Sequence, residues 1–468
     1  MEIRSKEFKE RAVFAIHDAS LQQALGKAGY GFVGKRALQV AELPEFEQLR
    51  EEAKNLKDHI LDHLDHYLER YEQAVVAAGG RVHWARDAEE ARRIILDICQ
   101  RVNAKTVTKG KSMVSEEIDL NEALIEHGME VVETDLGEYI IQLAHEPPSH
   151  IIAPAVHKTK DQVSDLFEKA HGGPRKTEVP ELVDEARRVL RDKYFRADVG
   201  ITGGNFLVAE TGSSIIVTNE GNGDLTQTLA RVHIVTSGIE RVVPTLDDAT
   251  LFLRLLARSA TGQETETYTT ISTGPRRPDD LDGPEEYHVV LLDNGRSKML
   301  AGRFRDMLRC IRCGACMNHC PVYGAVGGHA YGWVYPGPMG SVLTPLIKGL
   351  DVAYDLPNAC TLNGRCQAVC PVKIPLPELL RELRHLQHQQ EIGPAMQRRA
   401  LKAWQFVATR PKLYHAVEQV AVRVLSALAR RGRIRRLPLA SGWTDARDLP
   451  APAGRTFLEL WQGKRGQR

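Results

Sequence analysis

The sequence predicts an α/β domain over residues 1–293, an all-α, cysteine-rich module over 294–390 and a basic, mostly helical tail over 391–468. Three observations predict this order. Strand and helix patterns alternate through the first segment, and seven of the eight cysteines fall within 61 residues of the second. From residue 381 onward the chain holds 18 Lys and Arg against 6 Asp and Glu. Strands that alternate with helices of about a dozen residues favour a largely parallel sheet.

The α/β domain is predicted to begin with helices. Residues 46–79 carry apolar side chains at helical spacing over about nine turns. The same helix contains His59, His63 and His66, and two histidines four residues apart can bind zinc. No third ligand of a recognised zinc motif follows in the sequence. We therefore interpret the three histidines as solvated side chains on an exposed helix face.

The alternating part of the domain follows this helix. The patterns predict strands at 81–85, 105–110, 129–135, 231–237 and 286–293, further strands within 199–221, and helices at 88–102 and 115–128. Residues 273–286 are rich in Pro, Gly and charge, and are predicted to be a loop. Cys99 stands apart from the other cysteines, inside a helical pattern, and is predicted to be a small buried apolar side chain.

The first cysteine group is Cys310-x2-Cys313-x2-Cys316-x3-Cys320-Pro321. This is the spacing of a bacterial-type [4Fe–4S] motif, in which three closely spaced cysteines hold one cluster and the fourth ligates the other cluster. Pro321 lacks an N–H group and fixes its own φ, which helps to turn the chain out of the site. Zinc ribbons also use C-x2-C, but they do not need three evenly spaced cysteines followed by Cys-Pro. The group therefore predicts iron–sulfur chemistry.

The second cysteine group repeats the first with one change. Asn363 stands where the first group has Cys313. The crossed ligation rule predicts two clusters. The first takes Cys310, Cys313, Cys316 and Cys370, and the second takes Cys320, Cys360 and Cys366.

Asn363 leaves the second cluster with three cysteine ligands. Neutral Asn is a poor iron ligand beside thiolate. Three outcomes stay open: a [3Fe–4S] cluster, a [4Fe–4S] cluster with one iron held by water, another side chain or a partner, or no second cluster. Neighbouring clusters conduct single electrons. The sequence has no strand–GxGxxG–helix unit for NAD or FAD and no C-x-x-C-H haem motif, which favours an electron conductor.

Three segments together carry a family resemblance: TGGNFLVAETGSSIIVTNEGNGDLTQTL (202–229), CIRCGACMNHCPVYGAVGGHAYGWVYPGPMGSVLTPL (310–346) and CQAVCPVKIPLPELL (366–380). Over most of residues 10–390 the chain resembles the lactate-utilisation protein B family, the iron–sulfur subunit of a three-protein L-lactate oxidation system. The resemblance implies a domain with a fold like that of CoA transferases and ribose-5-phosphate isomerase, followed by a helical ferredoxin module. It also implies electron transport during oxidation of L-lactate to pyruvate, alongside two partner subunits. Asn363 departs from the full ferredoxin pattern.

The α/β domain also holds a candidate ligand site. Polar, glycine-rich turns bracket the apolar strand SIIV, and GKSM (110–113) lies at a strand-to-helix turn. Ligands of α/β sheets usually bind at strand ends. The candidates are Glu210, Asn219 and Glu220, with Lys111 as a partner for an anion. The alternative is that all four are ordinary turn residues.

Three functions remain open from the sequence. The first is an electron-transfer subunit of a lactate dehydrogenase complex, which is not catalytic alone and whose downstream acceptor is unknown. The second is an enzyme that acts on a CoA-type or carboxylate substrate in the α/β domain. The third is a non-catalytic redox-sensing or assembly module.

Charge and hydropathy predict the location. The N-terminus, MEIRSKEFKERAVFAIHDAS, is too charged for a signal peptide, and no stretch approaches about 18 uninterrupted apolar residues. We expect a cytoplasmic protein with no nucleic-acid partner. Residues 381–468 carry a net charge of +12 (18 minus 6), which leaves −11 for residues 1–380 of a chain of net charge +1. A basic tail with an amphipathic segment at 420–436 favours an acidic partner or peripheral contact with an anionic membrane, and a solvated helix face is the alternative.

Overall fold

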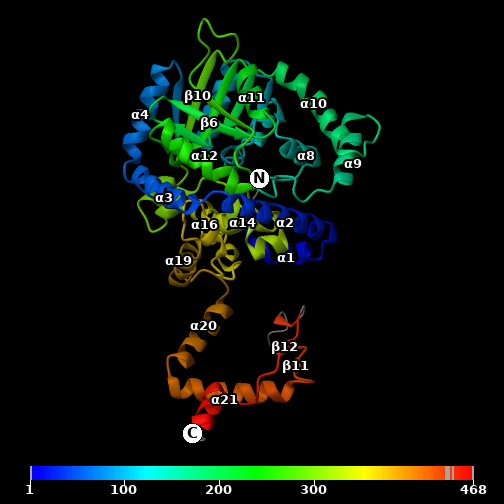
Figure 1. Ribbon diagram of the computed structural model, residues 1–468, viewed down its shortest axis with the longest axis vertical. Helices are drawn as coiled ribbons and strands as arrows, with labels where there is room; N and C mark the ends of the chain where they lie inside the picture. Colours follow the sequence, from blue (N-terminus) through cyan, green and yellow to red (C-terminus); the bar gives the residue numbers. More distant parts are fainter. Residues whose placement is uncertain (1–2, 438–442, 445–446, 466–468) are drawn as a thin grey trace. The chain divides into compact units, whose positions relative to one another are not determined.

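The computed structural model describes residues 3–437, 443–444 and 447–465, and the chain divides into two compact units, 1–389 and 390–468 (Figure 1). The first unit holds two sheets and all of the cysteines. The second holds the helices α20 (Ala395–Ala408), α21 (Pro411–Leu428) and α22 (Phe457–Arg465), and the strand pair β11 (Arg433–Ile434) and β12 (Leu449–Pro450). Among the described helices, none is both long and apolar enough to cross a bilayer.

A six-stranded sheet in which every neighbouring pair is parallel forms the centre of the first unit, as the alternating pattern predicts. Its order is β1 (Arg81–Ala85), β10 (Glu286–Leu292), β7 (Val232–Gly238), β4 (Val199–Gly203), β2 (Thr106–Lys109) and β3 (Glu130–Glu133). Every residue of β7 is buried, because helices cover both faces of a parallel sheet. The carboxyl ends of these strands share one edge of the sheet, where ligand sites of such sheets lie.

The crossover helices follow the predicted positions with one break. The prediction of 88–102 is confirmed by α5 (Ala88–Arg101), which is capped by Asp87 and buries Cys99 completely. The predicted helix 115–128 is instead two short helices, α6 (Met113–Glu117) and α7 (Leu120–Glu126), because Asp119 has φ +54°. The remaining helices around the sheet are α8 (Leu136–Ala144), α9 (Lys160–His171), α10 (Val179–Arg196), α11 (Asn222–Leu229) and α12 (Leu246–Ala260).

A second, four-stranded sheet packs beside the first in the order β8 (Val242–Val243), β5 (Phe206–Val208), β6 (Ser213–Thr218) and β9 (Tyr268–Ser272). The sequence patterns locate β5 and β6 but not β8 or β9. Two residues are too few to show a period, and β9 (YTTIS) is largely exposed, so neither strand has a hydrophobic signature.

The predicted long helix at 46–79 divides into α3 (Phe46–Asp62) and α4 (Leu64–Ala77), because His63 leaves helical geometry with φ −127° and ψ +34°. His59, His63 and His66 are all exposed, as predicted. The His59 ring contacts the Tyr67 hydroxyl at 3.0 Å and the His63 ring edge-on.

The described elements between residues 294 and 389 are helices: α13 (Arg296–Leu300), η3 (Arg305–Arg309), α14 (Ala315–Asn318), α15 (Pro321–Val326), η4 (His329–Tyr331), α16 (Gly337–Lys348), α17 (Asp355–Asn358), α18 (Arg365–Val369) and α19 (Leu376–Gln389). The connection between the cysteine groups is rich in Gly and Pro, which disfavour helix, yet part of it forms α16. Its first nine residues are all buried, so tertiary packing overrides their low helix propensity.

The N-terminal helices α1 (Phe8–His17) and α2 (Ala19–Ala41) pack against these helices (Figure 1). The Arg50 guanidinium, on α3, donates to the carbonyl of Cys370 at 2.7 Å and to that of Ala368 at 2.9 Å. Arg36 donates to the Val369 carbonyl at 3.1 Å. Two buried arginines thus hold the last carbonyls of α18, immediately before Pro371.

The closest backbone approach in the central sheet yields a stability prediction. A Cβ atom at Gly200 would lie 1.9 Å from the Thr226 carbonyl oxygen, whereas one at the exposed helix residue Gly26 would meet nothing within 4 Å. Gly200→Ala is expected to lower the free energy of unfolding by about 1–3 kcal/mol through overpacking. The matched Gly26→Ala should raise it by about 0.5–1 kcal/mol. Urea unfolding followed by circular dichroism measures both, and a Gly200→Ala variant as stable as the parent would contradict the packing of α11 on β4.

Candidate iron–sulfur centres and the adjoining pocket

The two cysteine groups begin with the same backbone conformation. Arg312 and Leu362 have φ of +58° and +55°, and the glycines two residues later, Gly314 and Gly364, have φ of +75° and +79°. The Arg312 N–H donates to the Sγ of Cys310 at 3.4 Å, and the Leu362 N–H to that of Cys360 at 3.3 Å. Left-handed backbone at a residue other than glycine costs roughly 1–2 kcal/mol, and such strain clusters at functional sites.

The cysteines that the crossed rule assigns to the first cluster surround one cavity. The cavity is lined by the cysteines of that set and by apolar side chains such as Ile311, Met339 and Val372, together with Arg312. The four cysteines are Cys310, Cys313, Cys316 and Cys370. Burial raises the pKa of Cys313, and its neighbours Cys370 and Cys310 raise it further. The structure therefore brings residues 60 positions apart in sequence into one group of thiols.

The cysteines assigned to the second cluster form a separate group. Burial raises the pKa of Cys366 to about 12, and the next contributions come from Cys360 and Cys320. The Sγ of Cys320 accepts the Tyr323 N–H at 3.5 Å, at the start of α15. The fourth position of this group is different. Asn363 is exposed, and its Oδ1 accepts the Arg365 N–H at 3.0 Å, whereas Cys313 in the first group is buried.

These groups fit iron–sulfur clusters by the chemistry of their donors. Burial raises the pKa of Cys370 to about 11, so an isolated thiol here would stay protonated at neutral pH. A bound metal cation reverses this preference and holds the thiolate. Backbone N–H groups already point at sulfur in both groups, as in the hydrogen bond from the Ile374 N–H to Cys370 Sγ at 3.4 Å. Such hydrogen bonds are one means by which proteins set cluster potentials.

A pocket lies at the carboxyl ends of the central strands and reaches the first cysteine loop. Lys111 follows β2, Gly203 ends β4, and Arg241 follows β7, and all three line the pocket. Arg312, between Cys310 and Cys313, lines both this pocket and the cavity of the first cysteine group. Arg312 therefore separates the pocket of the α/β domain from the cavity of the first cysteine group.

Of the four ligand-site residues suggested by the sequence, the structure brings three together. Lys111, Asn219 and Glu220 line the pocket. Burial raises the pKa of Glu220, and Asp135 beside it raises it further. Glu210 does not line the pocket: it is exposed, and its carboxylate accepts the Leu246 N–H at 3.4 Å. Glu210 and Glu220 are at the opposite ends of β6, so a rise of about 3.3 Å per residue keeps them apart.

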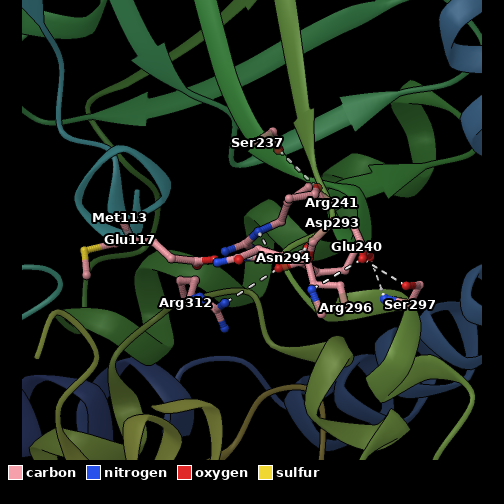
Figure 2. Close-up of polar contacts among 12 residues, drawn as sticks. Met113, Glu117, Ser237, Glu240, Arg241, Asp293, Asn294, Arg296, Ser297 and Arg312 are labelled. Carbon is pink, nitrogen blue, oxygen red and sulfur yellow. Dashed lines mark hydrogen bonds and ion pairs between the residues drawn. The ribbon is translucent and has the colours of Figure 1, made fainter. Parts of the chain in front are cut away.

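Sequence reasoning missed a buried cluster of charges beside the pocket (Figure 2). The Glu240 carboxylate lies 2.8 Å from Arg296 Nε, 3.6 Å from the Arg312 guanidinium and 3.9 Å from Arg241 Nε. Burial would raise the pKa of Glu240, but the arginines outweigh it and lower this pKa to about 2. Glu117 pairs with Arg296 at 2.8 Å. The charged pair inside the apolar run VHIVTSGIERVV (232–243) is the sequence signal that could have located this cluster.

Comparison with known proteins places these features in a family. Three family models match: the LUD domain over residues 68–292, the 4Fe-4S dicluster domain over 306–374, and the C-terminal domain of lactate utilisation protein B over 380–466. A crystal structure of a DUF162 family protein from Deinococcus radiodurans resembles 49% of this chain and 98% of its own, at 15% identity and a TM-score of 0.29, too weak a likeness to support an argument.

Curated relatives match the whole chain. Lactate utilization protein B of Bacillus licheniformis is 44% identical over 100% of this chain and 99% of its own, and that of Lysinibacillus sphaericus is 43% identical over 98% and 97%. The uncharacterized electron transport protein YkgF of Escherichia coli is 42% identical over 98% and 97%. The resemblance predicted from the sequence is confirmed, and this chain belongs to the lactate utilisation protein B family.

Proposed function

We propose that this protein is the iron–sulfur electron-transfer subunit of a system that oxidises L-lactate to pyruvate, and that it works with two partner subunits rather than as a catalyst alone. The observation that carries the proposal is the pair of separate thiol groups, each with the same left-handed turn after its first cysteine, in a chain of this family. Iron–sulfur clusters supply single-electron transfer when bound.

The chain's own residues would hold the two centres in different ways. Cys310, Cys313, Cys316 and Cys370 give the first centre four thiolates inside an apolar cavity. Cys320, Cys360 and Cys366 give the second centre three, with Asn363 exposed at the fourth position. We propose a [4Fe–4S] cluster for the first centre and, because the Asn363 amide is a poor ligand, a [3Fe–4S] cluster for the second.

The tail is proposed as a docking segment for a partner subunit. Its helices α20 and α21 bury no residue within the described unit, and they expose large apolar side chains such as Trp404, Phe406 and Val420 between basic residues. Exposed apolar area of this kind marks an interaction surface.

The first prediction tests the thiol assignment. Cys313→Ala is expected to remove about four irons per chain and to reduce lactate-driven electron transfer by at least about tenfold, because the first centre loses a thiolate. Cys99→Ala is the matched control, since Cys99 is also buried but lies in α5, away from both groups. Iron and sulfide analysis and lactate-driven reduction with the partner proteins measure both effects. Turnover of lactate by the pure chain would instead support an enzyme in its own right.

The second prediction tests the ligand missing at position 363. Asn363→Cys is expected to raise the iron content from about seven to about eight per chain and to abolish the paramagnetic signal of an oxidised three-iron centre. Thr361→Cys adds a thiol to the same exposed loop outside the ligand position and should change neither quantity. About eight irons in the parent would contradict a three-iron centre, and about four would contradict two clusters.

The third prediction tests the tail. Deletion of residues 391–468 should abolish co-purification of the partner subunits while the iron content of the remaining chain is retained, because both cysteine groups lie in the other unit. Affinity purification of the tagged chain from its native cells, followed by identification of bound proteins, measures this. Partners that stay bound after the deletion would contradict the docking role, and loss of membrane sedimentation alone would assign the tail to an anionic lipid surface.

A further inference from the structure

The pocket beside the first cysteine loop contains polar groups without protein partners. The Thr218 hydroxyl, the Asn222 amide oxygen and one Glu266 carboxylate oxygen are buried, line the pocket and make no hydrogen bond to a described residue. Buried polar atoms in folded proteins are almost always hydrogen-bonded, so each such group calls for a partner. Three in one pocket point to a ligand that both donates and accepts hydrogen bonds.

Two buried arginines in the same pocket also have unused hydrogen-bond donors, although the Arg312 guanidinium lies over the Tyr335 ring, 4.8 Å from its centroid. The side chains of Arg241 and Arg312 are each 9% exposed. Their nearest carboxylate is that of Glu240, at 3.9 and 3.6 Å, but this carboxylate is already engaged by Arg296 at 2.8 Å. Neither guanidinium donates a hydrogen bond to any residue in the described part of the chain, although each has five N–H donors.

Cationic side chains outnumber carboxylates around these arginines. Lys57, Arg241, Arg296 and Arg312 surround two carboxylates, those of Glu117 and Glu240. Burial lowers the pKa of Lys57 to about 7, and burial followed by the neighbouring Arg312 lowers that of Arg241. Burial is the first cause of both shifts, and a neighbouring arginine adds to each. Cationic side chains that line a pocket attract an anion.

Acidic side chains also line the pocket. Asp135, Glu220 and Glu266 are among them, and burial raises the pKa of both glutamates. In such a pocket the arginines can accept the negative charge of a ligand, and Thr218 and Asn222 can hydrogen-bond its hydroxyl or carbonyl group. Two guanidinium groups suit a planar carboxylate, which accepts paired N–H donors.

We propose that this pocket binds a small hydroxy- or oxo-carboxylate on Arg241 and Arg312, and that its occupancy is coupled to the redox state of the first cysteine centre. Arg312 provides the link, because it lies between Cys310 and Cys313 and contacts both cavities. One electron added at the cysteines brings one more negative charge close to the bound carboxylate and weakens its binding. By linkage, the carboxylate lowers the reduction potential of that centre. The coupling rests on the proposed electron-transfer function, whereas the binding site does not.

The experiment is a redox titration of the full chain, purified anaerobically with its clusters and followed by electron paramagnetic resonance. It is performed at constant ionic strength with L-lactate, pyruvate, inorganic phosphate or chloride. L-lactate or pyruvate should lower the midpoint potential of the first centre by about 59 mV for each tenfold preference for the oxidised protein. Phosphate and chloride should leave it unchanged. Equilibrium dialysis with radiolabelled pyruvate measures binding directly.

Variants assign the effect to the pocket. Arg241→Gln should abolish the shift and weaken pyruvate binding at least about tenfold, and Thr218→Val, which removes a hydroxyl without changing charge, should weaken binding while keeping the clusters. Arg254→Gln is the matched control, because Arg254 lies on α12, half exposed and paired with Glu45 outside the pocket. If the Arg241→Gln variant loses its clusters, the Thr218→Val variant decides whether the pocket binds the carboxylate.

Each remaining outcome is decisive. No binding and no shift in the parent would overturn the proposal, and an equal shift with phosphate or chloride would overturn the carboxylate assignment. Lactate-driven reduction without any carboxylate binding would refute the pocket and leave the electron-transfer function intact. Carboxylate binding with a shift of the midpoint potential, but no lactate-driven reduction with the partners, would refute the electron-transfer function and leave the binding pocket intact.

Discussion

The buried ion network around Glu240 is the interaction that the rest of the structure depends on. Its members come from four segments: Glu117 ends α6, Glu240 follows β7, Arg296 opens α13, and Arg312 belongs to the first cysteine loop. A fifth, Lys57 on α3, donates to the Glu240 carbonyl at 2.6 Å. Breaking a buried pair by removing one partner typically costs about 3–5 kcal/mol. The network therefore fixes the cysteine loop to the carboxyl edge of the sheet.

A second set of contacts fixes the other side of the cysteine helices. Arg36 and Arg50 hold the carbonyls that precede Pro371, and Ser5 Oγ donates to the Tyr331 carbonyl at 2.8 Å. The N-terminal segment thus packs on residues more than 300 positions away in the sequence. Cysteines from both groups can meet at one cavity because the loops that carry them are held from both sides.

Much of the fold could be predicted because its signals are local. The inner strands β7 and β10 are rich in apolar residues, and α5 combines an Asp cap with a strong apolar period. The spacing of the cysteines in the sequence likewise predicts which thiols lie together. The failures share a different cause. The helix α16 forms from Gly- and Pro-rich sequence because its surroundings bury it, and β9 is polar because much of it faces solvent.

The residues of the candidate site also fall into those that local sequence patterns locate and those that they do not. Lys111 and Glu220 could be found because turns after strands are recognisable, but Glu210 was grouped with them although a six-residue strand separates the two turns. Arg241 and Arg312 were not found at all. Nothing local distinguishes a buried, under-paired arginine from a surface one, because the pairing depends on partners brought together only by the fold.

The two turns at Cys310 and Cys360 also differ in their exposure to solvent. In the first, Ile311, Cys313 and Gly314 are buried, whereas in the second, Thr361 and Asn363 are exposed. One turn is insulated by the sheet domain and the other is presented to whatever docks from outside. A protein that exchanges electrons with this chain by brief collisions meets the second turn first. The two copies of the motif thus differ in their access to solvent, and Asn363, which stands where the first copy has Cys313, lies on the exposed copy.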